Sequence, residues 1–354
     1  MSAVRIAVAS DERYLPGAIG TLAGLRIALA TDVPMEVAFL HDGLPCQKQQ
    51  RLLTALAKIC GDTSVHFIRI DGGFTGFPEF YFSSKLTYAR LLLPSLLDWE
   101  RLIYIDTDFL VLRSLEPLYR RETGEYGISA AAEYSIQKIA GDFPEAALAD
   151  QVDANADYFN AGLLVLNLEK IRQNRLFDRA TRILSEYPSA CKLHDQSALN
   201  YAANGRFIHL EQEWNIQNHR ACFDPVGAID LLANRSINTH FVTDAKPWLS
   251  WCPYPANEMF RLLLDKVDSE WRTASYRERE VLIRHKYSMA SFLPIFFLAR
   301  AFLKKSMGID GGSDLRTAGF WRTAAADMRR MRRQAANLDS LFREWSREID
   351  AKLV

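Results

Sequence analysis

The triplet Asp106-Thr107-Asp108 places two carboxylates one residue apart, directly after the apolar run of residues 102–105. Carboxylates at this spacing can bind one divalent cation from a single loop, and their hard oxygen atoms suit Mn²⁺ or Mg²⁺. Such a cation stabilises the charge that develops on a departing diphosphate. An isolated Asp-x-Asp triplet is typical of a solvated turn. Here apolar residues flank the triplet on both sides, where a carboxylate is costly unless it is paired or bound to a metal.

Apolar runs alternate with helical patterns over most of the chain. Ile19, Leu22, Leu25 and Leu29 recur at helical spacing after the first run. The stretch 205–257 contains many loop-forming residues. Strands that alternate with helices indicate an α/β protein with a mostly parallel sheet, covered by helices on both faces. The predicted strands cover residues 4–9, 35–40, 65–70, 102–105 and 162–168, and the predicted helices include 45–60 and 175–187.

Polar residues follow two of these predicted strands at the point where the strands end. Ser10-Asp11 comes after the first strand, and Asp106-Thr107-Asp108 comes after the fourth. Ligands of open α/β sheets bind beyond the carboxyl ends of the strands. The sequence therefore predicts a ligand site at this edge of the sheet.

Six motifs in a fixed order resemble those of the retaining glycosyltransferases of family eight, over roughly residues 4–275. Bacterial members of that family include lipopolysaccharide glucosyltransferases and lipooligosaccharide galactosyltransferases. The resemblance implies a GT-A-type fold, which is a Rossmann-like, mostly parallel mixed sheet flanked by helices. The motifs are ASDERY at 9–14, LTYAR at 86–90, DTD at 106–108, YFNAG at 158–162 with Asn167-Leu168 following, Asp195-Gln196 with Leu199-Asn200 following, and HFVTDAKPW at 240–248.

The resemblance implies a metal site made by Asp106, Asp108 and His240, with the phosphates of a UDP-sugar as further ligands. Neutral imidazole is acceptable to Mn²⁺. Lys246 provides a point charge for phosphate. A histidine considered alone is more often a core residue, but the Lys-Pro-Trp turn after His240 favours a site.

The same resemblance assigns the nucleotide to residues near the first strand. Ala9, Asp11 and Tyr14 fall where the family binds uracil and ribose, and the Tyr14 ring offers a face for base stacking. Arg13 is a less usual occupant of this loop. We expect Thr107 and Lys246 to complete the nucleotide-binding set.

The predicted donor-sugar contacts are Arg90, Asn160, Ala161, Gly162 and Asp195. We expect Gln196 to be catalytic, with its carbonyl facing an oxocarbenium-like centre, and His194 beside this pair to be structural. Many family members carry an acidic residue after the glutamine, whereas this chain has Ser197. This departure favours same-face attack guided by the leaving phosphate, with catalysis resting on orientation and electrostatic stabilisation.

The last part of the chain is basic, although the formal net charge of the whole is zero. From residue 281 onward 14 Lys and Arg stand against 7 Asp and Glu. Leu338, Leu341, Trp345 and Ile349 recur there at helical spacing. We predict a catalytic domain at 1–275 and a basic, aromatic-rich helical appendage at 276–354. Basic residues interleaved with aromatics suit an anionic membrane surface, the alternative being a docked helical subdomain with solvated arginines.

Other features bound the location and the partners. No secretory signal is visible at the N-terminus, which places the predicted activity in the cytoplasm, peripheral to the inner face of a bacterial cytoplasmic membrane. The apolar window 292–303 is shorter than the roughly 20 residues needed to span a bilayer. Five scattered cysteines indicate reduced thiols. No reading module accompanies the basic residues, so we expect no nucleic-acid partner.

The sequence therefore predicts an enzyme that transfers a hexose, galactose or glucose, from a UDP-sugar to a glycan or glycolipid acceptor such as lipopolysaccharide. Two alternatives remain open. One is a catalytically silent relative that binds sugar nucleotides or membranes, and the other is a self-glucosylating enzyme resembling glycogenin.

Overall fold

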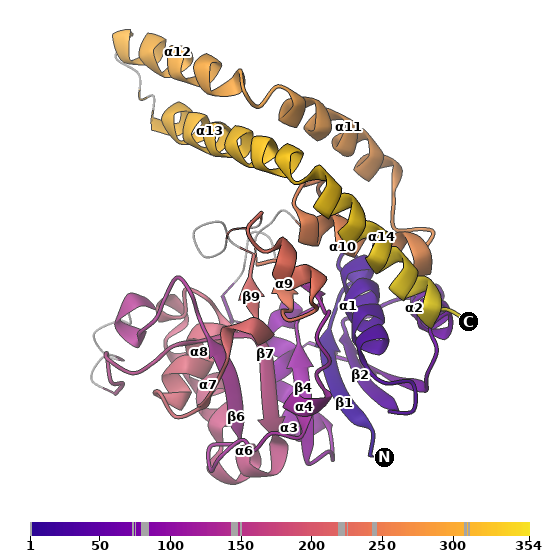
Figure 1. The fold of residues 1–354 in the computed structure, drawn as a ribbon. Helices are drawn as coiled ribbons and strands as arrows, with labels where there is room; N and C mark the ends of the chain where they lie inside the picture. The colour runs from indigo at the N-terminus through magenta and orange to yellow at the C-terminus, as the bar shows by residue number, and fades with distance from the viewer. Residues whose placement is uncertain are drawn as a thin grey trace.

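A seven-stranded mixed sheet forms the centre of the molecule in the computed structural model (Figure 1). The structure describes residues 2–354 apart from 73, 75, 79–84, 143–147, 149–150, 219–223, 225, 243–245, 308–309 and 311. The strand order is β3-β2-β1-β4-β7-β6-β8. These strands are β1 (Val4–Ala9), β2 (Met35–His41), β3 (Thr63–Arg69), β4 (Arg101–Ile105), β6 (Ile128–Ala132), β7 (Phe159–Asn167) and β8 (Ile208–Leu210).

The sheet is parallel through its first four members and mixed beyond them. β3, β2, β1 and β4 are parallel, β7 runs antiparallel to both β4 and β6, and β8 is parallel to β6. The central strands are apolar on both faces, which is typical of sheets covered by helices on two sides. The predicted α/β architecture with a mostly parallel mixed sheet is confirmed.

Helices cover both faces of the sheet. Ile6 and Val8 of β1 pack into one apolar cluster, while Ala7 between them belongs to the opposite cluster, because successive strand residues point to opposite faces. The first cluster includes residues of α1 (Leu15–Ala28), α2 (Cys46–Ala57) and α10 (Pro255–Val267). The second includes residues of η1 (Lys85–Leu92), α3 (Leu93–Leu96), α6 (Leu168–Asn174), α7 (Leu176–Glu186) and α8 (Asp195–Ala203).

A second, three-stranded sheet lies beside the first, with the order β5-β10-β9. It consists of β5 (Phe109–Leu110), β9 (Ile216–Gln217) and β10 (Thr239–His240). These short strands, together with β8, lie mostly in the stretch we expected to be rich in loops. The remaining short helices are α4 (Glu116–Tyr119), η2 (Ile139–Asp142), η3 (Pro188–Ala190), η4 (Gln212–Trp214) and α9 (Ile229–Ala233).

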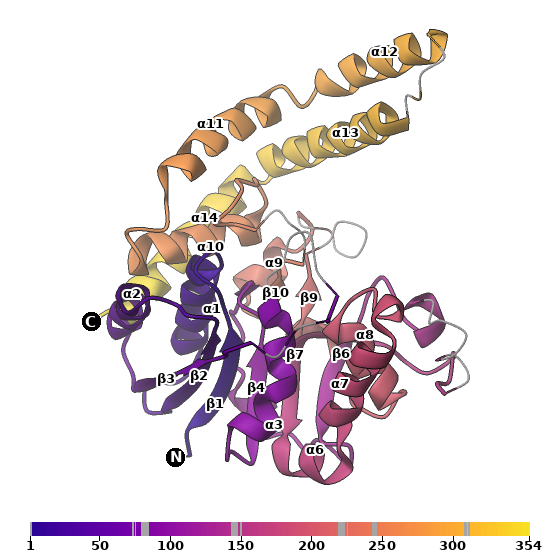
Figure 2. The ribbon, with the colours of Figure 1, turned by 180° about the vertical axis from the view of Figure 1, so that it is seen from behind.

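The C-terminal part of the chain is helical and projects from the body as a long arm (Figures 1 and 2). Its helices are α11 (Ala274–Ser288), α12 (Leu293–Ser306), α13 (Gly312–Arg333) and α14 (Ala335–Lys352). α12 and α13 lie side by side away from the sheet, whereas α14 returns to the body. Asp314 on α13 is buried and forms ion pairs with Arg300 and Lys304 of α12 at 2.8 and 2.9 Å, which fastens the two helices together.

The last helix is part of the body's core. Trp345 is only 1% exposed, and its indole N–H donates to the Met259 carbonyl of α10 at 2.9 Å. The chain then pairs with the segment after α2, where the Cys60 N–H donates to the Lys352 carbonyl at 2.7 Å. We expected Trp345 to belong with the aromatic residues suited to a lipid surface, and for Trp345 this interpretation is wrong, because α10 covers its ring.

Within the described part of the chain, no helix is both long and apolar enough to cross a membrane. None of the described cysteines, Cys46, Cys60, Cys191 and Cys252, forms a disulfide. Cys222 lies outside the described residues, as do positions 243–245 of the sixth motif.

Candidate active site

The acidic triplet and His240 meet where the two sheets adjoin. Asp106 directly follows β4, and Asp108 directly precedes β5. β5 pairs antiparallel with β10 in a register that sets Phe109 opposite His240. The Phe241 N–H also donates to the Asp108 carbonyl at 2.8 Å. Backbone pairing therefore brings together side chains more than 130 positions apart in the sequence.

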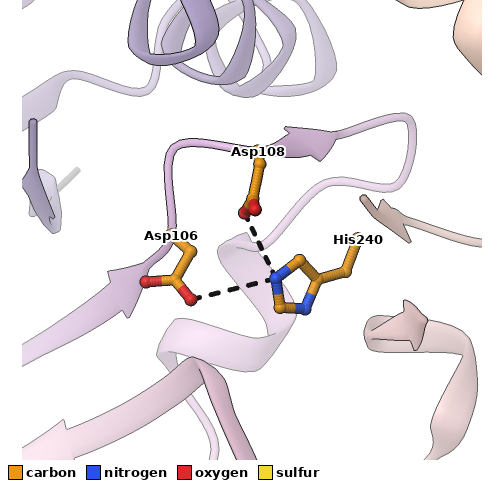
Figure 3. Close-up of side chains that lie close together, drawn as sticks. All are labelled: Asp106, Asp108 and His240. Atoms are coloured by element: carbon orange, nitrogen blue, oxygen red, sulfur yellow. Dashed lines mark ion pairs between the residues drawn. The ribbon is translucent and has the colours of Figure 1, made fainter. Parts of the chain in front are cut away.

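The three side chains are close enough to share one ion (Figure 3). The Nε2 atom of His240 lies 3.2 Å from Oδ1 of Asp108 and 3.8 Å from Oδ2 of Asp106. One ligand atom from each residue falls within 4.8 Å of the other two. Oδ1 of Asp108 is buried and has no hydrogen-bond donor among the described residues. Two carboxylates and an imidazole form a donor set that fits Mn²⁺ or Mg²⁺.

Two neighbours hold the His240 ring closely. Phe109 stacks on it with 4.3 Å between ring centroids and an interplanar angle of 18°. Gly162 is the second neighbour, where an added Cβ would stand 2.2 Å from Cε1 of His240. The approach of the imidazole thus requires glycine at position 162, a role for Gly162 beyond the sugar contact that we predicted.

Two buried cations neutralise the acidic groups. Lys246 Nζ lies 2.6 Å from Oδ2 of Asp108, and it also donates to the Phe241 carbonyl. Burial alone would raise the pKa of Asp108, but Lys246 and His240 outweigh it and hold the pKa of that carboxyl below its usual range. The pKa of Asp106 is raised, chiefly by burial, which the nearby Arg90 offsets only in part.

Arg90 connects the triplet to the predicted sugar-binding segment. Its guanidinium lies 2.8 Å from Oδ1 of Asp106 and 2.9 Å from Oδ2 of Asp195, and it donates to the Ala161 carbonyl at 2.5 Å. Burial opposes the charge of Arg90, but Asp106 and Asp195 raise the pKa of the guanidinium above its ordinary value. Thr87 also donates to Oδ1 of Asp195 at 2.5 Å. The N–H groups of Arg90 therefore bind and position groups of the protein. Direct contact between Arg90 and a sugar stays a prediction.

One cavity beside the triplet, of about 150 Å³, contains the residues predicted to bind the nucleotide. Oδ1 of Asp11 accepts the Tyr14 N–H at 2.9 Å, which orders the loop after β1. The Tyr14 ring meets Trp248 edge-on at 5.8 Å. The cavity is lined by Ala9, Ser10, Asp11, Tyr14, Leu86, Thr87, Arg90, Tyr104, Asp106, Thr107, Asp108 and Lys246.

A second cavity, of about 390 Å³, also borders Asp106 and Asp108. The side-chain carbonyl of Gln196 accepts the Ala161 N–H at 3.0 Å. The lining includes Arg90, Asn160, Ala161, Gly162, Asp195, Gln196 and His240. The two cavities share Thr87, Arg90, Asp106 and Asp108. The structure therefore brings all the sequence-predicted site residues together, in two adjacent spaces that meet at the acidic triplet.

Two residues of this site were missed in the sequence. Glu133 lines the larger cavity, and its Oε2 accepts from Asn160 Nδ2 at 2.8 Å and from Gln196 Nε2 at 3.2 Å. Glu133 directly follows β6, so the strand-end rule that identified Asp106 applies to it as well, but residues 128–132 were not predicted as a strand. Asn215 lies behind His240, and its Oδ1 is 3.1 Å from Nδ1 of the ring. The spacing of residues in the sequence does not predict a role for Asn215, because only the fold brings it next to His240.

His194 is buried beside Asp195, and its Nδ1 lies 3.0 Å from the Tyr88 hydroxyl. Burial lowers the pKa of His194 to about 4. His194 also lines the larger cavity, and the structural role expected for it stays a prediction.

The fold and the site define the class of the protein as a glycosyltransferase. Residues 5–252 match glycosyl transferase family 8, and the chain belongs to this family. It is 24% identical to a lipopolysaccharide 1,2-glucosyltransferase of Escherichia coli over 63% of this chain and 69% of that protein. It is 23% identical to a lipopolysaccharide 1,3-galactosyltransferase of Salmonella typhimurium over 75% of this chain and 78% of that protein.

Among solved structures, the chain resembles the galactosyltransferase LgtC in complex with donor and acceptor sugar analogs. The TM-score is 0.61 at 23% identity, covering 76% of this chain and 99% of that one. This likeness shows a shared fold and confirms the predicted GT-A-type architecture. Membership of family 8 confirms that the chain is a sugar-transferring enzyme.

Proposed function

We propose that this enzyme transfers galactose or glucose, with retention, from a UDP-hexose to the glycan of a lipopolysaccharide or lipooligosaccharide acceptor. The observation that carries the proposal is the position of Asp106, Asp108 and His240 at the junction of two adjacent cavities. A nucleotide in the smaller cavity and a sugar in the larger one would place the diphosphate at this junction. The lipopolysaccharide transferases among its relatives support the acceptor class.

Asp106, Asp108 and His240 would hold Mn²⁺ or Mg²⁺, which stabilises negative charge on the departing UDP. Lys246 lines the nucleotide cavity and adds a second positive charge beside the phosphates. Asp11, Tyr14, Ala9 and Thr107 line the same space and would bind the nucleoside and ribose.

The larger cavity supports same-face attack. Its carboxylates near Gln196 are engaged, because Glu133 accepts from Gln196 and Asn160, and Asp195 is tied to Arg90 and Thr87. Ser197 is fully buried and its hydroxyl accepts the Leu193 N–H at 2.8 Å, so a covalent intermediate at that position has no support. Asn160, Ala161, Gly162 and Asp195 would orient the hexose, and the Gln196 carbonyl would face the anomeric carbon.

Within the predicted appendage 276–354, helices α12 and α13 support work at an anionic membrane, whereas α14 packs against the body. Exposed apolar side chains of α12 and of the residues next to its two ends recur at helical spacing, so they share one face: Phe292, Ile295, Phe296, Phe302, Leu303 and Met307 are each at least 58% exposed. α12 and α13 also carry basic residues, among them Arg300, Lys304, Arg316 and Arg322, of which Arg300 and Lys304 pair with Asp314. Apolar rings with flanking cations suit an interfacial helix on anionic lipid, here the inner face of the cytoplasmic membrane.

The test is product analysis with UDP-glucose, UDP-galactose and other UDP-sugars, offered with lactoside and lipid-core acceptors. We expect one hexose to be added to the acceptor in the anomeric configuration of the donor, as read by mass spectrometry and proton NMR. An inverted product would refute retention. A hexose found on the protein itself would favour self-glucosylation, and an inert chain would favour a catalytically silent relative.

A further inference from the structure

A chain of hydrogen-bonded side chains runs behind the candidate metal site from Glu133 to His240. It passes through Asn160 at the start of β7 and Asn215 before β9, and all four residues are buried. The orientation of each amide in this chain follows from its neighbours. This orientation in turn decides which nitrogen of His240 carries the hydrogen.

Two partners with fixed roles orient the Asn160 amide. The Gly162 N–H can only donate, and it lies 2.9 Å from Oδ1 of Asn160. The Glu133 carboxylate can only accept, and its Oε2 lies 2.8 Å from Nδ2 of Asn160. The Asn160 oxygen therefore faces Gly162, and its second lone pair is available to Asn215.

Asn215 is oriented in its turn by Asn160. Its Nδ2 donates to Oδ1 of Asn160 at 2.8 Å, which leaves its own Oδ1 at 3.1 Å from Nδ1 of His240. Because an amide oxygen accepts, Nδ1 of the imidazole must be the donor. In the neutral ring Nε2 then carries a lone pair, and it faces the Asp108 oxygen 3.2 Å away. Two lone pairs this close repel each other, and either a second ring proton on Nε2 or a divalent cation relieves that repulsion.

We infer that Asn215 is a positioning residue that fixes the Nδ1–H tautomer of His240 and so reserves Nε2 for a divalent cation. The inference rests on the metal-dependent function proposed above. Stacking on Phe109 and the close approach of Gly162 already hold the ring in place. Asn215 therefore acts by fixing which ring nitrogen carries the hydrogen. Hydrogen-bond partners of ligating histidines have this role in other metal sites.

The same series of hydrogen-bonded side chains, from Glu133 to His240, also joins the candidate metal site to the larger cavity. The Glu133 oxygen that orients Asn160 also accepts from Gln196, the predicted catalytic residue. One buried carboxylate thus sets the direction of both amides, one toward the metal ligand and the other toward the sugar.

Two substitutions of Asn215 separate this role from packing. Asn215→Ala removes the acceptor opposite Nδ1, whereas Asn215→Asp keeps an acceptor there but loses the N–H that donates to Oδ1 of Asn160. We expect Asn215→Ala to weaken Mn²⁺ binding by about 10- to 100-fold, and Asn215→Asp to recover part of the affinity. The measurement is electron paramagnetic resonance of free Mn²⁺ in titrations of the full chain with UDP present. Asn167→Ala, at the far end of β7, is the control, because this buried asparagine caps α6 and touches no metal ligand.

The tautomer is measured directly by long-range proton–nitrogen NMR of protein labelled with ¹⁵N-histidine, without metal and at alkaline pH. We expect the His240 signals of an Nδ1–H ring in wild type and in Asn215→Asp, and a changed pattern in Asn215→Ala. An Nε2–H ring in wild type, unchanged Mn²⁺ affinity in Asn215→Ala, or an equal loss in the Asn167→Ala control would overturn the inference. Wild-type protein that binds no Mn²⁺ but shows the Nδ1–H pattern would refute the proposed function while supporting the tautomer.

Discussion

The position of the His240 ring depends on neighbouring residues that take no part in metal binding. The ring contacts Phe109 and Gly162, while Asp106 and Asp108 face one of its nitrogens. The acidic triplet was predictable from sequence because charge at the end of an apolar strand is costly without a partner. The contact between Gly162 and the imidazole was not predictable from spacing, because it depends on the pairing of β5 with β10.

Gly162→Ala tests this contact. A Cβ at this position would stand 2.2 Å from Cε1 of His240, so the ring must leave its present position beside the two carboxylates. We expect Mn²⁺ affinity to fall by about tenfold or more, with little change in secondary structure by circular dichroism. The control is Gly319→Ala on α13, where an added Cβ meets nothing within 4 Å and the helix should gain about 1 kcal/mol. Equal Mn²⁺ affinity in wild type and Gly162→Ala would contradict this account.

His194 should make the stability of the fold depend on pH. Burial lowers its pKa from 6.5 to about 4, so the unfolded chain takes up a proton more readily than the native one. The stabilisation from the neutral ring is fully present above the unfolded pKa, and it is lost as pH falls toward the native pKa. We expect urea titrations of wild type to show declining stability over this window, and the decline to be shallower in His194→Asn. Parallel pH profiles for the two proteins would exclude His194 as the cause.

At the scale of elements, the predicted strands and helices of the body were largely confirmed, with ends shifted by a few residues. The strand expected at 162–168 begins earlier, at Phe159, and ends at Asn167, which caps α6 through the Lys170 N–H. β9 and β10 were not predicted, because strands of two residues carry no periodicity. These short strands nevertheless deliver His240 to the site, so the part hardest to predict is the part that completes it.

The last helix is the element whose role the sequence could not decide. Its apolar residues recur at helical spacing, but such a stripe fits a protein core and a membrane equally well. We expect Trp345→Ala to lower the free energy of unfolding by about 3–5 kcal/mol, because a fully buried indole is lost. Phe302→Ala on α12, whose ring is 73% exposed, should change it by less than about 0.5 kcal/mol. Chemical denaturation measures both, and equal effects would contradict the division of roles between the two helices.

At the scale of the molecule, a sugar-transferring body carries a helical arm (Figure 1), and several apolar side chains of α12 are exposed. The charge asymmetry of the chain predicted a distinct appendage. The sequence did not predict that this appendage consists of an exposed pair of helices, α12 and α13, and a last helix, α14, that packs on the body. Only the tertiary contacts between α10 and α14 show this division. The arm supports a view in which α12 rests on lipid while the body processes the glycan.

Vesicle sedimentation tests the arm. We expect binding to vesicles with anionic lipid, weakened by salt, and little binding to neutral vesicles. Replacing Phe296 and Phe302 together by Ser should weaken binding by about tenfold or more, because two largely exposed rings no longer enter the lipid. Transfer to a soluble lactoside should be unchanged. Leu231→Ser on α9, an exposed apolar residue of the body, is the matched control and should bind as wild type does.

The most direct test of the central claim is UDP release from the preferred UDP-hexose by wild type and Asp108→Asn, with Mn²⁺ supplied or removed by a chelator. Asparagine keeps the size of the side chain and an acceptor for Lys246, so the fold should survive. We predict release by wild type only when the metal is present, and a loss of about 100-fold or more in Asp108→Asn at every Mn²⁺ concentration. Release by wild type that persists in chelator, or a variant as fast as wild type, would contradict the account.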